Sequence, residues 1–130
     1  MKFLLGYDGS NAAMDALKLA IKHAKAFGAD LYVISSLTGG SEEMESKIKT
    51  SNDQLEFVED YVKKAGVSCE THLMIRGLTP GEDLVRFAKD EKIDTIFIGV
   101  KRRSPVGKLL FGSNARYVIV NAPCPVVSIR

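Results

Sequence analysis

The chain has 130 residues, of which 45% are hydrophobic and 26% are charged, and its formal net charge is +2. This composition is typical of one folded domain over residues 1–130 and excludes a disordered chain. The small net charge argues against a nucleic-acid partner, and no apolar run is long enough to cross a membrane. Cys69 and Cys124 lack the spacing of a disulfide framework, so we expect reduced thiols in a cytoplasmic protein.

Five predicted strands alternate with four predicted helices, and the first strand is the apolar stretch 2–7. Ser10 is expected to cap the first helix, whose apolar residues recur at helical spacing until Gly28 ends it. The second strand is predicted over 31–36. A glycine-containing turn at 38–40 then leads toward the second helix.

The second helix is predicted to begin at Ser41 and to end at Gly66. Its apolar pattern weakens at 50–53, where we expect a bend or fraying. The third strand, 67–75, alternates apolar and polar side chains. Such alternation is typical of a strand with one face in water, so we expect it near an edge of the sheet.

The third helix has the clearest start signal, because Thr79 and Glu82 have the spacing of a capping box. The fourth strand, 95–100, is almost continuously apolar, which indicates a central strand of a parallel sheet. A last helix is predicted over 113–121 and a short final strand over 126–129.

This alternation predicts an α/β fold with right-handed crossovers between parallel strands. We expect a single open five-stranded parallel sheet in the order 3-2-1-4-5, with helices on both faces, in a Rossmann-like arrangement. In such sheets ligands bind beyond the carboxyl ends of the strands, where the strand order reverses. The expected order therefore places a binding crevice between the first and fourth strands.

Two of these strand ends carry residues with binding chemistry. Asp8 follows the first strand, although an Asx turn or a helix cap would explain this residue without any ligand. After the fourth strand, Gly99 leads into a basic segment that returns to a helix start at Gly112 and Ser113. Cations and the N–H groups of a helix start favour phosphate, whereas a solvated basic loop explains the same residues equally well. The cations of this segment are Lys101, Arg102, Arg103 and Lys108.

Three parts of the sequence together form one pattern: residues 8–10 near the start, residues 121–127 near the end, and Gly99 with Gly112 between them. This pattern resembles the universal stress protein family over nearly the whole chain. The family's nucleotide signature is Gly, two residues, Gly, nine residues, Gly, then Ser or Thr. Gly99, Gly112 and Ser113 match it, whereas Arg102 stands at the middle glycine.

The resemblance implies that the protein binds ATP or AMP, with Mg²⁺ as an optional companion, and acts as a regulatory or stress-response module. It implies slow or absent hydrolysis and no catalytic residue. Arg102 would either contact phosphate as a cation or narrow the pocket. The nucleotide-binding residues implied in this way are Gly6, Asp8, Ser36, Gly99, Lys101, Arg102, Arg103, Gly112, Ser113 and Asn114.

Assembly and function each leave alternatives open. The final strand lies at the end of the expected order, and its apolar Val126, Val127 and Ile129 favour antiparallel pairing in a two-fold homodimer. The resemblance implies the same dimer, and a monomer with a covered edge is the alternative. For function, the alternatives are a nucleotide-free dimeric scaffold and an ATPase, for which no general base is visible. A receiver domain is excluded because the third strand ends without an aspartate.

Overall fold

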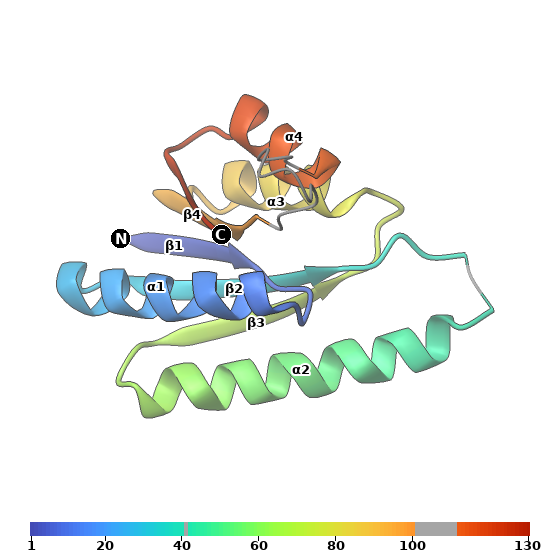
Figure 1. Ribbon diagram of the computed structural model, residues 1–130, viewed down its shortest axis with the longest axis horizontal. Coiled ribbons are helices and arrows are strands. Elements are labelled where there is room, and N and C mark those ends of the chain that lie inside the picture. The colour runs from blue at the N-terminus through green and yellow to red at the C-terminus, as the bar shows by residue number, and fades with distance from the viewer. Residues whose placement is uncertain (41, 101–111) are drawn as a thin grey trace, which may run out of the picture.

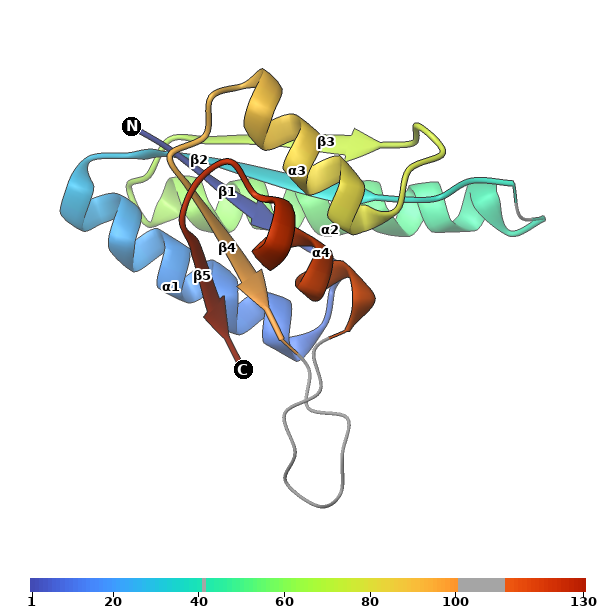
Figure 2. The same ribbon diagram turned by 90° about the horizontal axis from the view of Figure 1, so that it is seen from above.

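The structure, a computed structural model, describes residues 1–40, 42–100 and 112–130. Its strands form one parallel sheet in the order β3-β2-β1-β4-β5, which confirms the predicted order. Helices α1 and α2 cover one face of the sheet, and α3 and α4 cover the other (Figure 1; Figure 2). In chain order the elements are β1 (Lys2–Gly6), α1 (Asn11–Phe27), β2 (Asp30–Ser36), α2 (Met44–Lys64), β3 (Cys69–Met74), α3 (Pro80–Asp90), β4 (Thr95–Gly99), α4 (Ser113–Asn121) and β5 (Val126–Ile129).

The central strands are apolar because both of their faces are buried. In β1, Phe3 and Leu5 pack toward α1 and α2, whereas Leu4 between them packs toward α3 and α4. Successive side chains of a strand point to opposite faces, so a strand covered on both sides shows no polar alternation. At the edge of the sheet, β3 has only Cys69 buried, which agrees with the edge position that its sequence predicts.

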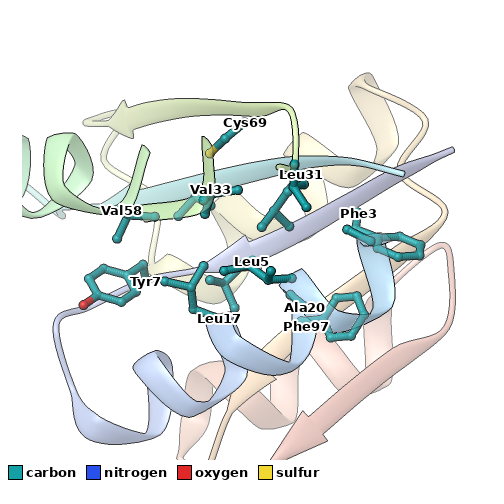
Figure 3. Packing of buried hydrophobic residues seen from close by; sticks show 14 of the residues in the cluster. Phe3, Leu5, Tyr7, Leu17, Ala20, Leu31, Val33, Val58, Cys69 and Phe97 are labelled. Carbon is teal, nitrogen blue, oxygen red and sulfur yellow. The ribbon is translucent and has the colours of Figure 1, made fainter. Parts of the chain in front are cut away.

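Two hydrophobic cores result, one on each side of the sheet. Figure 3 shows the larger core, which lies between the sheet and helices α1 and α2. Phe97 belongs to this core, with its ring centroid 5.3 Å from that of Phe3 and 5.3 Å from that of His23. Burying a side chain of this size contributes about 1.5–3 kcal/mol, so Phe97 contributes substantially to the free energy of folding. The smaller core includes Leu4, Ile34, Leu84, Ile96, Ile98 and Val118.

The helix ends follow their sequence signals closely. The Ser10 side chain accepts the N–H of Ala13 at 3.1 Å, and Gly28 ends α1 in the left-handed conformation, with φ 65°. The predicted capping box is confirmed, because Thr79 accepts the N–H of Glu82 and donates its own to the Glu82 carboxylate. These bonds to Thr79 lower the pKa of Glu82. None of the described helices combines the length and apolar character that a membrane crossing requires.

Helix α2 departs from its predicted course. It begins at Met44 rather than at Ser41, which lies outside the described residues, and no side chain caps its start. The predicted bend at 50–53 is wrong, because the helix continues through this polar stretch. The buried Ser51 is small enough to keep the helix against the sheet, and Leu55 extends the buried stripe. The boundaries of all five strands, in contrast, lie within one or two residues of those predicted.

The carboxyl end of β4 packs directly on the first turn of α1. A Cβ atom added to Gly99 would lie 2.4 Å from the carbonyl carbon and oxygen of Ala12, which are backbone atoms with no freedom to rotate away. At the neighbouring strand end, a Cβ on Gly6 would meet only the Leu84 side chain, at 2.8 Å. The signature glycine of β4 therefore has a packing reason that is independent of any ligand.

We expect Gly99→Ala to lower the free energy of unfolding by about 2–3 kcal/mol, since α1 must move off the sheet. The matched variant Gly6→Ala should cost about 1 kcal/mol or less, because the Leu84 side chain can change rotamer. Urea denaturation followed by circular dichroism measures both values. Equal losses in the two variants would contradict this account of the β4–α1 contact.

Candidate functional site

A cavity of about 240 Å³ lies at the carboxyl ends of β1, β2 and β4. Here the chain leaves β1 toward one side of the sheet and β4 toward the other, so the sheet order reverses at this point. Five residues predicted for the site line this one cavity: Gly6, Asp8, Ser36, Gly99 and Asn114. The crevice expected between the first and fourth strands is therefore present, although the ligand roles of these residues remain predictions.

The two walls of the cavity differ in chemistry. Toward α3 and α4 the wall is mostly apolar, with side chains of the smaller core, Ile34, Leu84, Ile98 and Val118, and with Ser36 and Asn114 as its polar residues. Toward α1 and α2 the wall carries polar groups from two segments, the turn after β1 and helix α2: Asp8, Ser10, Ser51 and Gln54. A cavity with one mostly apolar and one polar wall fits a flat, partly polar ligand that can be oriented in one way.

Asp8 stands in the turn between β1 and α1. Its Oδ1 accepts the N–H of Ser10 at 3.0 Å, which is the Asx turn that the residues alone predict. This turn holds the carboxylate at the cavity lining. Next to it, burial and then the charge of Asp8 raise the pKa of Tyr7, whose hydroxyl points away from the core (Figure 3). The phenol therefore stays protonated and can donate a hydrogen bond.

The start of α4 reaches the cavity through Asn114. Its Oδ1 accepts the N–H of Gly81 at 3.0 Å and so joins the first turns of α3 and α4. The two helices touch there, because a Cβ on Gly81 would lie 2.9 Å from the Asn114 carbonyl oxygen. Gly112 is the N-cap of α4 and provides no capping side chain. The N–H groups of the first turn of α4 therefore suit an anion.

Several predicted site residues are not among the cavity lining. Gly112 and Ser113 directly precede Asn114 in sequence. Neither of them is among the described residues that line the cavity. Lys101, Arg102 and Arg103 lie outside the described residues. The basic part of the predicted phosphate site therefore stays a prediction.

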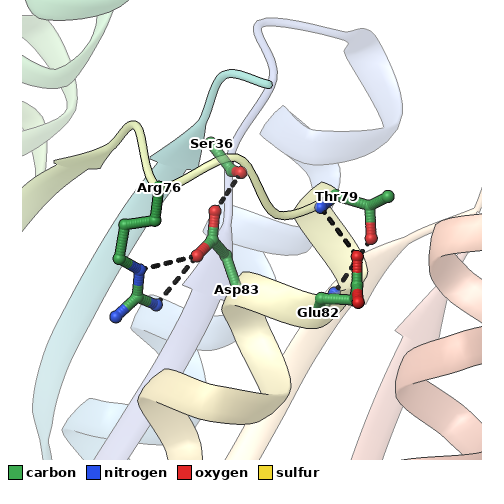
Figure 4. Close-up of polar contacts among 5 residues, drawn as sticks. All are labelled: Ser36, Arg76, Thr79, Glu82 and Asp83. Carbon is green, nitrogen blue, oxygen red and sulfur yellow. Dashed lines mark hydrogen bonds and ion pairs between the residues drawn. The ribbon is translucent and has the colours of Figure 1, made fainter. Parts of the chain in front are cut away.

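Sequence reasoning missed an ion pair beside the cavity, between a buried carboxylate and a partly exposed arginine. Asp83 of α3 is fully buried; its Oδ1 accepts a hydrogen bond from Nε of Arg76 at 2.9 Å and forms an ion pair with Nη2 at 2.8 Å. The hydroxyl of Ser36 donates to the other carboxylate oxygen. Figure 4 shows Arg76 and Ser36 meeting the Asp83 carboxylate on different oxygens. In sequence Asp83 is one of two acidic residues in a helix first turn, so nothing distinguishes it from an exposed residue.

Within the described residues, the side chains offer little support for a metal site or for a reactive cysteine. Outside residues 41 and 101–111, no three His, Cys, Asp or Glu side chains are grouped to hold a metal ion. Cys69 and Cys124 are both free thiols. Burial is the main cause that raises the pKa of Cys69 to about 11, so this thiol stays protonated and a poor nucleophile near neutral pH.

The whole chain is similar to proteins of one family. Residues 1–130 match the universal stress protein family. A universal stress protein from Methanocaldococcus jannaschii is 34% identical, over 99% of this chain and 81% of that protein. A solved universal stress protein from Archaeoglobus fulgidus has a TM-score of 0.90 and 37% identity, over 100% of this chain and 98% of that one.

A second solved structure brings a ligand into the comparison. It is a universal stress protein from Archaeoglobus fulgidus in complex with dAMP, with a TM-score of 0.81 and 32% identity. The similarity covers 100% of this chain and 98% of that one. Together with the family match over every residue, these relatives show that the chain belongs to the universal stress protein family.

Proposed function

We propose that the cavity binds an adenine nucleotide, ATP or AMP, and that the protein is a regulatory module of the stress response with slow or absent hydrolysis. The observation that carries the proposal is the joint position of Gly6, Asp8, Ser36, Gly99 and Asn114 around one cavity with a mostly apolar and a polar wall. A relative 32% identical to this chain, in complex with dAMP, supports the same ligand class.

The chemistry of the walls suggests how such a ligand would lie. The apolar wall suits the face of the base, and the carboxylate of Asp8 suits the ribose hydroxyls, because it accepts hydrogen bonds. The phosphates would extend toward Gly112 and Ser113, where the N–H groups of a helix start favour an anion. Mg²⁺, where present, would be held largely by the phosphates and water, as is usual for this ion.

We expect AMP to give saturable heat in titration calorimetry, whereas ribose 5-phosphate, which lacks the base, should bind more weakly. The variant Asp8→Asn keeps the Asx turn, because asparagine forms the same turn. It should nevertheless lose about 1 kcal/mol of AMP affinity, since the charged acceptor is gone. Unchanged thermal stability of this variant is the control. No heat with AMP or ATP up to millimolar concentration would refute the proposal.

A separate prediction concerns Arg102, which occupies the position of the middle signature glycine. If its guanidinium contacts phosphate, Arg102→Ala should weaken ATP by about 1.5–3 kcal/mol and leave adenosine almost unchanged. Arg86→Ala removes the same charge from an exposed position on α3 and is the matched control. Equal losses for ATP and adenosine, or tighter binding, would show that Arg102 fills space instead.

The alternative function is a dimeric scaffold of the same fold without a nucleotide, and the arginine at position 102 favours it. The two functions differ in what the purified protein contains. Chromatography of the supernatant from a dialysed and then denatured sample detects any released nucleotide. A stoichiometric adenine nucleotide supports the first function and argues against the scaffold.

We also propose a two-fold homodimer through β5. This strand is at the edge of the sheet, and an edge strand offers unpaired N–H and C=O groups to another chain. Val126, Val127 and Ile129 are only partly buried within one chain. In the preceding helix α4, Ile119 and Val120 are exposed apolar side chains. A second copy placed antiparallel along β5 would close the edge by symmetry.

Val127→Lys should shift the protein from dimer to monomer in sedimentation velocity, because a charge at the proposed interface must be desolvated. Its circular dichroism should stay that of the unmodified protein. Phe57→Lys introduces the same charge at an exposed apolar position on α2 and should leave the dimer intact. An unmodified protein that sediments as a monomer at tens of micromolar would overturn the dimer.

A further inference from the structure

The ion pair beside the cavity has a consequence for ligand selection. We infer that Arg76 and Asp83 fix the Ser36 hydroxyl as a hydrogen-bond acceptor toward the cavity, and so select a purine with an amino group at its 6-position over one with a carbonyl. The inference rests on the proposed nucleotide function and deepens it. Adenine carries that amino group, and hypoxanthine and guanine carry the carbonyl.

The first step is the state of Asp83. Its side chain has no exposure to solvent, and both of its oxygens accept hydrogen bonds. The guanidinium of Arg76 is always charged and lies 2.8 Å from Oδ1 through Nη2. Both oxygens of this carboxylate therefore face donors, Arg76 on one and Ser36 on the other. Removing Arg76, whose side chain is partly exposed, would leave the buried Asp83 carboxylate without its countercharge, which is strongly unfavourable.

The second step is the direction of the Ser36 proton. A serine hydroxyl has one proton and two lone pairs, and here the proton is donated to Oδ2 of Asp83. Ser36 also lines the cavity, at the last position of β2. The hydroxyl therefore has only lone pairs left for a ligand. Without Asp83 the same hydroxyl could rotate and donate to the ligand instead.

The third step is the part of a nucleotide that Ser36 would meet. Ser36 is two residues after Ile34, so both side chains point to the face of the sheet that carries α3 and α4. Ile34 and Leu84 belong to the apolar wall, which suits the base. A polar edge of the base beside this wall then meets the Ser36 lone pairs. An amino group at this edge of the base would donate a hydrogen bond to Ser36. A carbonyl oxygen at the same place would face another acceptor, and it would lose the hydrogen bond that it makes to water in the free ligand.

Three ligands test this selection by calorimetry: AMP, inosine 5′-monophosphate and purine riboside 5′-monophosphate, which has no group at the 6-position. In the unmodified protein we expect AMP to bind about tenfold more tightly than the purine riboside compound, the value of one good hydrogen bond. The inosine compound should bind more weakly still, because its carbonyl opposes the lone pairs of Ser36.

Two variants separate Ser36 from the pair that orients it. Ser36→Ala should reduce the tenfold preference for AMP over the purine riboside compound to less than about twofold, because the acceptor is lost. In Asp83→Asn, the amide oxygen should stay on Arg76, which offers two donors. The amide NH₂ then faces Ser36 and donates to it. The freed hydroxyl proton can point to the ligand, so the preference for AMP over the inosine compound should fall below about threefold.

Glu82→Gln is the matched control, because it changes carboxylate to amide in the same helix turn and a glutamine preserves the capping box. It should keep the selectivity of the unmodified protein, and thermal melts establish that each variant is folded. If Asp83→Asn does not fold, Ser36→Ala decides the question alone. Equal binding of AMP and the inosine compound, or a preference that survives in Ser36→Ala, would overturn the inference and leave nucleotide binding intact. Failure of all three ligands to bind would instead refute the proposed function.

Discussion

Burial of β1 and β4 on both faces is the constraint on which the rest of the structure depends. A central strand with no exposed face needs helices on both sides, and parallel strands reach that state only through crossover helices. In the sheet, β2 and β4 lie on opposite sides of β1. The helix that follows β1 therefore packs on one face of the sheet, and the helix that follows β4 packs on the other. The cavity at the carboxyl ends of β1 and β4 is a direct result of that divergence.

The fold could be predicted almost completely from the sequence because its signals are local and agree with one another. Thr79 with Glu82 marks a helix start, and the apolar run at β4 marks a central strand. The bend expected at 50–53 failed for a physical reason: a polar stretch does not interrupt a helix when its buried position is a small residue such as Ser51. Hydrophobic spacing shows where apolar side chains are, but not where a small polar one is tolerated.

The candidate site could be predicted where it depends on strand ends and on the start of α4, which carries Asn114. Asp8 and Gly99 follow strands whose neighbours the topology fixes, so their meeting at one cavity follows from the strand order. The ion pair of Arg76 and Asp83 could not be predicted. An aspartate looks the same in sequence whether it is buried or exposed, and only the folded structure shows which cation lies beside it. Ser36 was expected to border the site, but its hydrogen-bond direction depends on that unforeseen pair.

The hydrogen bond between Gly81 and Asn114 joins the two helix starts that border the cavity. Gly81 is two residues before Asp83, so the same helix turn carries both the contact to α4 and the carboxylate to which Ser36 donates. The walls on this side are thus held in place before any ligand arrives. A preorganised pocket of this kind loses little conformational entropy on binding, and that saving appears directly as affinity.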